Sequence, residues 1–220
     1  MSSKSFKELM KRRYSARGFL PKPIPEDVLK DIISTSLLTP SWGNTQPWHI
    51  HVACGKTLEE IRNEWIAQNK EGVKGHSDLK AGHRTDFSQK CQENMAKAIK
   101  RFDEVLKDPK AAKVWEANSR MFDSPTVVYI TVPKTRTEYC VFDCGAIEMA
   151  IMMAAMEHDV DTIAAYELIK YPDILRKHLK IPDDEDILIG ISLGYEDKDN
   201  ILSKIKQDKF NLEQACNFYN

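Results

Sequence analysis

The chain has 220 residues, of which 42% are hydrophobic and 30% are charged, a composition that excludes fibrous and intrinsically disordered proteins. With 32 Lys and Arg against 33 Asp and Glu the formal net charge is -1, so no overall positive field favours nucleic acid and any anion site has to be local. We expect no membrane-spanning segment, because Asp143 and Glu148 interrupt the most apolar stretch, 139–156, before it reaches the roughly 20 apolar residues that span a bilayer.

The N-terminus, the cysteines and the histidines indicate the compartment and the metal content. Residues 1–15 are basic and lack the apolar stretch of a signal peptide. The five cysteines are odd in number and show no CxxC or Cys/His metal spacing, although Cys140 and Cys144 lie four apart. His49 and His51 alternate along a predicted strand, which does not indicate a metal site. We therefore expect reduced thiols, no metal and a cytoplasmic protein.

In the first half of the chain, apolar periodicity and proline positions predict the elements. Predicted helices cover 5–13, 26–38 and 56–68, the second beginning after Pro25 and ending before Pro40. A loop rich in turn formers, 40–47, leads into a strand over 48–53. From 69 to 87 the periodicity fades and glycines appear, which predicts a mobile excursion near a site.

In the second half, helical patterns return over 88–106 and 110–122, a β-branched run predicts a buried strand over 125–132, and a long helix follows over 137–158. That helix is apolar nearly all round from Cys144 to Met156, so it has to be covered by its own sheet and by a partner subunit. Further elements are predicted after this helix: a strand at 161–165, a helix at 171–179 and a strand at 186–195. The tail that follows is polar, but its apolar residues need a protein surface to pack against. Without repeats or a credible linker, 1–220 is expected to form one α+β domain.

Residues 12–17 form the first candidate binding cluster. Arg12, Arg13 and Arg17 lie close together, with Tyr14 and Ser15 between them. A guanidinium binds a phosphate dianion through two parallel hydrogen bonds, each contributing roughly 1.5–3 kcal/mol, and a hydroxyl adds a directional donor. The same pattern also fits a solvated basic patch.

The loop at 40–48 is the second candidate. Asn44 and Gln46 each carry a planar donor–acceptor pair that matches the imide-like edge of a flavin or a nucleobase. Pro40 and Trp42 can cover the face of a ring. The loop can equally be structural, with its amides capping turns.

Two lysines near the end of the chain, Lys206 and Lys209, are the third candidate. They can complete a phosphate pocket. Lysines in a polar tail are also commonly just solvated.

Together these motifs resemble the FMN-dependent nitroreductase family. Arg13-x-Ser15-x-Arg17 is followed by Phe19 and, about two dozen residues later, by Pro40-Ser41-x-Gly43-Asn44-x-Gln46-Pro47-Trp48. The segment 183–195 looks like the family's late helix–strand unit, and 143–158 is similar to its central dimer helix. The resemblance implies an α+β fold with a nitroreductase-like central mixed sheet flanked by helices, in an intertwined homodimer.

In that family FMN lies at the dimer interface, so the resemblance implies a site built from both subunits. It implies that Arg13 and Ser15 hold the phosphate and ribityl chain and that Arg17 lies near the flavin pyrimidine, where a positive charge tunes the potential. From one subunit the implied FMN-binding residues are Arg13, Tyr14, Ser15, Arg17, Lys206 and Lys209. From the other they are Pro40, Ser41, Trp42, Asn44 and Gln46.

The family also presents backbone N–H groups to flavin N5 and O4, and the matching positions here are Ala164, Ala165 and Tyr166. The family commonly has a proline and an acidic or amide residue followed by a small residue there. Backbone donors survive any side chain, but Tyr166 either crowds the pocket or packs as an ordinary aromatic. Phe122 has two interpretations, a substrate platform on the open flavin face or a core residue. No general acid or base is indicated, because the flavin carries the electrons.

The function implied is an FMN-dependent oxidoreductase that passes hydride from NADH or NADPH through flavin N5 to a nitroaromatic, quinone or enone by a ping-pong mechanism. A flavin-binding sensor, storage or regulatory protein with little turnover is the alternative, favoured by Ala164-Ala165-Tyr166. A nucleotide- or RNA-binding protein that uses residues 12–17 is a third possibility, and the nearly neutral net charge counts against it.

Overall fold

A computed structural model describes residues 5–80, 82–111 and 116–219 of the chain. Its centre is a four-stranded sheet in the order β1-β2-β4-β3, in which every pair of neighbouring strands is antiparallel. An isolated parallel bridge between Ser15 and Thr162 adds a parallel pairing on the outer side of β3 and gives the sheet its mixed character. The strands are β1 (His49–Cys54), β2 (Thr126–Pro133), β3 (Asp161–Ala165) and β4 (Glu185–Gly194).

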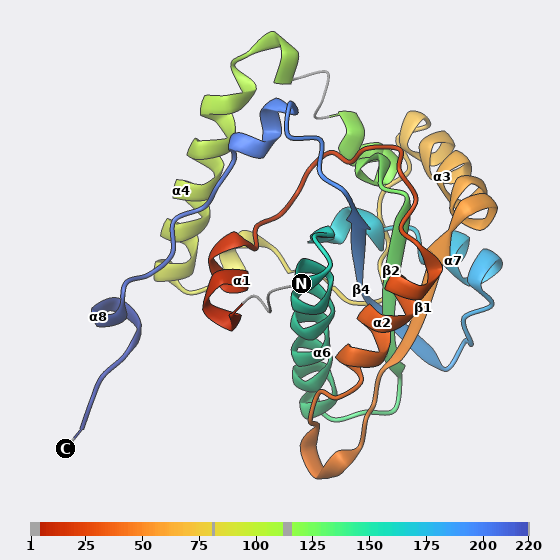
Figure 1. The fold of residues 1–220 in the computed structure, drawn as a ribbon, viewed down its shortest axis with the longest axis horizontal. Coiled ribbons are helices and arrows are strands. Elements are labelled where there is room, and N and C mark those ends of the chain that lie inside the picture. Colours follow the sequence, from red (N-terminus) through yellow and green to blue (C-terminus); the bar gives the residue numbers. More distant parts are fainter. Residues whose placement is uncertain (1–4, 81, 112–115, 220) are drawn as a thin grey trace.

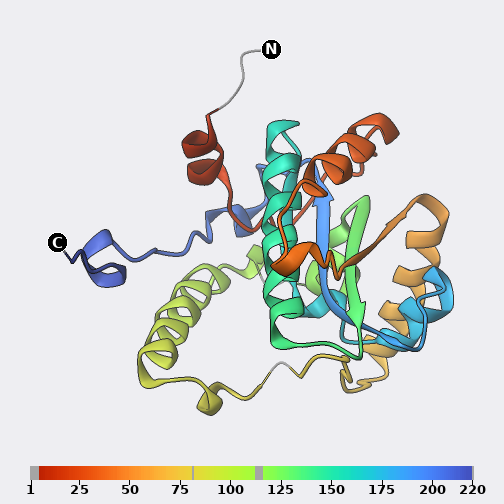
Figure 2. The ribbon, with the colours of Figure 1, turned by 90° about the horizontal axis from the view of Figure 1, so that it is seen from below.

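Helices cover both faces of this sheet (Figures 1 and 2). The α-helices are α1 (Phe6–Arg12), α2 (Glu26–Ser36), α3 (Gly55–Lys70), α4 (Gln89–Leu106), α6 (Glu138–Glu157), α7 (Pro172–Leu179) and α8 (Leu212–Ala215). Short 3-10 segments are η1 (Trp42–Asn44), η2 (Arg84–Asp86), η3 (Glu116–Asp123), η4 (Tyr166–Leu168) and η5 (Ile201–Lys204). Apart from η3, each helix and strand predicted from the sequence is present within a few residues of its expected bounds.

The alternation of side chains along β2 explains the two cores. Val128 and Ile130 belong to the core under α2 and α6, whereas Val127 and Tyr129 belong to the core under α3 and α7. Successive residues of a strand point to opposite faces, so a β-branched run with apolar residues at every position has to be buried on both sides. The sheet is therefore the middle of three layers.

The predicted helix over 110–122 includes residues 112–115, which lie outside the described residues, and it is wrong in its last part. Met121, Phe122 and Asp123 have φ values of 57°, 59° and 55°, the left-handed region that non-glycine residues rarely adopt. Arg62 of α3 holds this turn by donating hydrogen bonds to the carbonyls of Arg120 and Ser124. Because these bonds come from a distant helix, local periodicity could not reveal the turn.

The segment that follows α3 is tied to the body of the protein. His76 N donates to Lys170 O at 2.8 Å, and the Tyr171 hydroxyl donates to Val73 O at 2.9 Å. Ile187 N donates to Asp78 Oδ2 at 2.8 Å, which joins the segment to β4. The predicted excursion thus lies along the surface next to η4 and α7.

Helix α6 has more apolar surface than its own chain covers. By length and composition alone it could cross a membrane, and 44% of its most apolar stretch is buried inside the protein. It packs against α2 and the sheet, and its side chain Asp143 is buried. An apolar stripe runs along one face at helical spacing, in which Phe142, Gly145 and Ala146 are exposed and Met149 and Met153 are half-buried.

Candidate functional site

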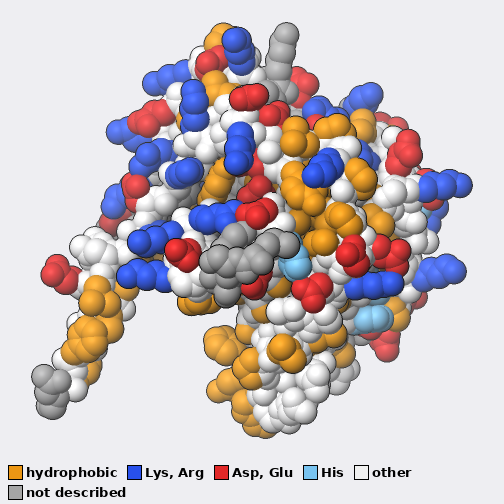
Figure 3. All heavy atoms as spheres, viewed as in Figure 1, with side chains coloured by type: hydrophobic (Ala, Val, Ile, Leu, Met, Phe, Trp, Pro, Cys, Tyr) orange, Lys and Arg blue, Asp and Glu red, His pale blue; other side chains and the backbone are white. Residues whose placement is uncertain are grey.

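A cationic pocket lies between α1 and the C-terminal tail. Its volume is about 560 Å³, and six of its described lining residues are Lys or Arg while none is Asp or Glu. The lining residues are Lys7, Met10, Lys11, Arg13, Tyr14, Ser15, Arg17, Ile205, Lys206, Gln207 and Lys209. Lys and Arg side chains also gather over α4, α1 and the tail in Figure 3. The structure therefore brings the predicted Arg13–Arg17 cluster and the two predicted tail lysines together in one cationic cavity.

The local sequence explains why the cluster lies there. Ser5 and Glu8 form a capping box that starts α1, and Arg13 N donates to Leu9 O at 2.9 Å as the helix ends. The chain then runs beside the outer edge of β3, where Ala16 N donates to Thr162 O at 3.0 Å. This attachment holds Arg13, Tyr14, Ser15 and Arg17 on a rigid edge.

Tyr14 is a fixed wall of the pocket. Its hydroxyl donates a hydrogen bond to Glu196 Oε2, and Lys206 Nζ lies 4.8 Å from the centre of its ring. Burial, followed by the bond to Glu196, raises the pKa of Tyr14, so the phenol stays neutral. Burial also raises the pKa of Glu196. Tyr14 therefore contributes its ring to the pocket, and its hydroxyl is occupied.

The two outer arginines of the cluster differ sharply in their surroundings. Arg17 Nη1 donates to Ser15 O at 2.9 Å, and its guanidinium carbon lies 4.7 Å from the centre of the Phe102 ring on α4. Burial lowers the pKa of Arg17, yet a guanidinium remains charged at neutral pH. Arg12 instead pairs with Asp159 at 2.7 Å and is not among the pocket residues.

The proline-bracketed loop lies at the other end of α6. Trp42 N donates to the buried carboxylate Asp143 Oδ2 at 2.9 Å, and Gln46 N donates to Ser41 Oγ at 2.9 Å. Gly43, Asn44 and Gln46 have φ values of 56°, 58° and 44°. Left-handed residues so close together are a form of strain that proteins keep at functional loops.

This loop and the cationic pocket do not meet within one protomer. Asp143, in the second turn of α6, anchors the loop, and Asp159, just after α6, pairs with α1. The two anchors are therefore separated by roughly 20 Å along the helix axis. Residues 40–47, which contain η1, are called the η1 loop below. Figures 1 and 2 show α1 and the η1 loop at separate places along α6. Pro40, Trp42, Asn44 and Gln46 are exposed and Ser41 is half-buried.

Ala164, Ala165 and Tyr166 lie where β3 ends and η4 begins. Ala164 and Ala165 pair with Ile191 and Gly190 of β4, and Tyr166 is 43% exposed. A Cβ at Gly75 would come within 2.9 Å of the Tyr166 hydroxyl, so the tied segment after α3 passes close to this side chain. Phe122 is buried in the core, which excludes the interpretation as a substrate platform.

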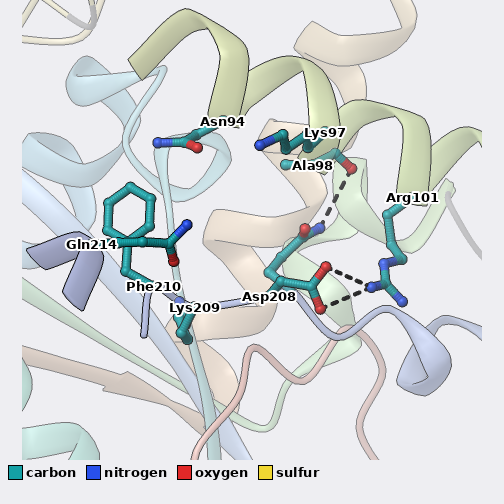
Figure 4. Close-up of a pocket in the computed structure, with 9 residues that line it drawn as sticks. Asn94, Lys97, Ala98, Arg101, Asp208, Lys209, Phe210 and Gln214 are labelled. Atoms are coloured by element: carbon teal, nitrogen blue, oxygen red, sulfur yellow. Dashed lines mark hydrogen bonds and ion pairs between the residues drawn. The ribbon is translucent and has the colours of Figure 1, made fainter. Parts of the chain in front are cut away.

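A second, open pocket explains how the tail is held against α4 (Figure 4). Arg101 Nη2 donates to both carboxylate oxygens of Asp208 at 2.9 Å, and Gln207 Nε2 donates to Ala98 O at 3.5 Å. Lys209 lines both this pocket and the cationic one. Helix α4 thus positions the strand of tail that supplies the two lysines.

Sequence reasoning missed five of the described residues that line the cationic pocket: Lys7, Met10, Lys11, Ile205 and Gln207. Lys7 and Lys11 are four apart on α1, so their side chains lie on one face of that helix. That spacing was visible in the sequence. Gln207 carries no comparable signal.

Comparisons with known proteins agree with this geometry. The model of the Nitroreductase family matches residues 10–195. A chloronitrobenzene nitroreductase from Comamonas testosteroni is 28% identical over 96% of this chain and 95% of its own, and a nitrobenzene nitroreductase from Ectopseudomonas oleovorans is 29% identical over the same shares. The crystal structure of the FMN-dependent nitroreductase NfnB from Mycobacterium smegmatis in complex with NADPH covers 97% of each chain with a TM-score of 0.89 at 22% identity, which shows a shared fold.

Proposed function

The chain is a member of the nitroreductase family, and on that basis we propose that it is an FMN-dependent oxidoreductase that passes hydride from NADH or NADPH to a nitroaromatic, quinone or activated enone. The observation that carries the proposal is the cationic pocket. Six described cations without a carboxylate among them surround a hydroxyl, which fits the phosphate and ribityl chain of FMN. When bound, FMN supplies two-electron transfer between the nicotinamide and the oxidant in alternating half-reactions.

In this proposal the protein binds the phosphate of FMN, orients the flavin and excludes water from it. Arg13, Lys206 and Lys209 neutralise the phosphate and Ser15 donates its hydroxyl. Arg17 keeps a positive charge at the edge of the pocket, where it favours uptake of electrons. Backbone N–H groups of residues 164–166 orient the reacting edge.

We propose that the site is completed by a second copy of the chain. The first part of the apolar stripe on α6 is exposed, with Phe142 74% exposed. Hydrophobic side chains gather along the left and lower margins of the lower protrusion in Figure 3, where α6 begins and the η1 loop lies. The tail also projects from the body with Phe210, Leu212 and Phe218 exposed (Figure 1). Surfaces of this kind indicate an interface.

A two-fold axis beside α6 accounts for the divided site. Two antiparallel α6 helices bring the first turns of one next to the last turns of the other. The η1 loop, anchored at Asp143, then reaches the partner's cationic pocket, which adjoins Asp159. Pro40, Ser41, Trp42, Asn44 and Gln46 would thereby cover the ring. The five free thiols suit a reducing cytoplasm, to which we assign the protein.

The purified protein should be yellow and should bleach when NADH or NADPH is added without air. Adding excess quinone or nitrobenzene should restore the colour and then sustain steady turnover. A colourless protein that does not take up FMN would contradict the proposal. Turnover no faster than that of the same concentration of free FMN would favour a sensor or storage role.

Arg13→Ala should weaken FMN binding at least about tenfold, because it removes charge-assisted bonds worth roughly 1.5–3 kcal/mol each. Arg12→Ala is the matched control, since Arg12 pairs with Asp159 and does not line the pocket. Fluorescence quenching of FMN on titration measures both dissociation constants. Equal losses in the two variants would show that Arg13 does not bind the phosphate.

Tyr166→Ala should lower the KM for bulky nitroaromatics and leave the dissociation constant of FMN within about threefold. The reason is that Tyr166 stands beside Gly75 at the end of β3 and narrows access, while the backbone donors remain. Tyr166→Phe is the matched control and should behave like the native protein. An unchanged ratio of KM values for bulky and small acceptors would contradict this role.

A further inference from the structure

Three side chains from two strands face one another at the end of the sheet where β1 and β4 begin, and none of them lines the cationic pocket. His49 and His51 are two apart on β1, so they share a face, and Glu185 begins β4. One ligand atom from each lies within 4.8 Å of the other two. Among the described residues, these three form the one group of His, Cys, Asp or Glu side chains whose ligand atoms all lie that close together.

We propose that His49, His51 and Glu185 form a binding site for one divalent transition-metal ion, and that zinc is the ion they suit best. The donor set is two imidazoles and one carboxylate, which zinc accepts with a fourth position left for water. His49 is exposed at the edge, so that position opens to solvent.

The distances are close to those that a metal would impose. His49 Nδ1 lies 3.3 Å from Glu185 Oε1, and His51 Nε2 lies 3.8 Å from Glu185 Oε2. Zinc–nitrogen and zinc–oxygen bonds of about 2.0–2.2 Å in a tetrahedron separate the ligand atoms by about 3.3–3.6 Å. The His49–Glu185 distance already falls in this range, and the His51–Glu185 distance exceeds it by about 0.2 Å.

The carboxylate is held for this role by a further residue. The Thr131 hydroxyl donates a hydrogen bond to Glu185 Oε2, and Thr131 lies opposite His49 in the β1–β2 register. Hydrogen bonds of this kind fix the orientation of metal-binding side chains. Three paired strands, β1, β2 and β4, therefore carry the ligands and their support, and no flexible loop is needed.

The charges around the cluster also favour a cation. The imidazole rings of His49 and His51 lie 4.3 Å apart between their centres, and both aim a nitrogen at the same carboxylate. Arg176 donates to the backbone carbonyl of Glu185 at 2.8 Å and pairs with Asp78 at 2.7 Å. Arg136 pairs with Asp186 at 2.6 Å.

A metal here would clamp the edge strand. His49 comes two residues after Pro47, where the η1 loop ends. Glu185 lies on β4, which is separated from β1 by β2. An ion that joins them fixes the start of β1 to β4. Because the pocket that we assign to FMN has none of these residues, the inference stands apart from the proposed function.

Zinc titration of the chelator-treated, otherwise intact protein tests the site. Isothermal calorimetry should give one zinc per protomer with a micromolar or tighter dissociation constant, and zinc should raise the melting temperature until EDTA is added. His49→Ala, His51→Ala and Glu185→Gln should each weaken binding more than tenfold. His158→Ala is the matched control, because His158 pairs only with one carboxylate, Asp31, at 2.7 Å and should leave zinc affinity unchanged.

The zinc X-ray absorption edge identifies the donors, and it should show nitrogen and oxygen without sulfur. Absence of saturable binding, sulfur ligation, or affinity that survives His49→Ala together with Glu185→Gln would overturn the proposal. His49 is exposed and Glu185→Gln keeps an acceptor for Thr131, so both variants should fold. Circular dichroism checks this, and His49→Ala alone decides the matter if the other variants unfold.

Discussion

The constraint on which the rest of the structure depends is the apolar surface of α6. One side of this helix is buried against α2 and the sheet, and the other side carries an outward apolar stripe from Phe142 to Met153. Burial stabilises by about 25 cal/mol per Å² of apolar surface, so the second copy that we propose would be held by covering that stripe. Because the η1 loop is anchored near the start of α6 and the cationic pocket near its end, the way α6 is covered also decides whether the site is complete.

The cationic pocket is the second element of the account. Gathering six Lys and Arg side chains around one cavity is unfavourable unless an anion joins them, and among the lining residues that are described no carboxylate does so. Hydrogen bonds around the pocket hold these residues in place. Ala16 bonds to β3, Tyr14 bonds to Glu196, and Arg101 bonds to Asp208 of the tail. A pocket so firmly built and so strongly charged is suited to a phosphate group.

Sequence reasoning located those features that depend on local pattern. Apolar periodicity gave α2, α3 and α6, and Pro25 and Pro40 marked the limits of α2 within a few residues. It failed at Met121 and Phe122, where Arg62 from another helix stabilises a left-handed turn.

In the candidate site too, residues adjacent in the sequence could be predicted, and residues that meet only in the fold could not. The cluster Arg13–Arg17 was visible because its residues are adjacent, whereas Gln207 joins it only through the tail's attachment to α4. The histidines of β1 gave no metal signal because Glu185 is 134 positions after His51 and meets it only in the folded sheet.

The central claim is that each site combines Arg13 of one protomer with the η1 loop of its partner. The most direct measurement is FMN binding by a mixed dimer of Arg13→Ala chains and Trp42→Ala/Asn44→Gly chains, in which glycine preserves the left-handed backbone at position 44. The account predicts that neither parent binds FMN tightly, and that the mixed dimer regains one site of native affinity per two chains. A mixed dimer without any site of native affinity would show that both elements act within one chain and would contradict the account.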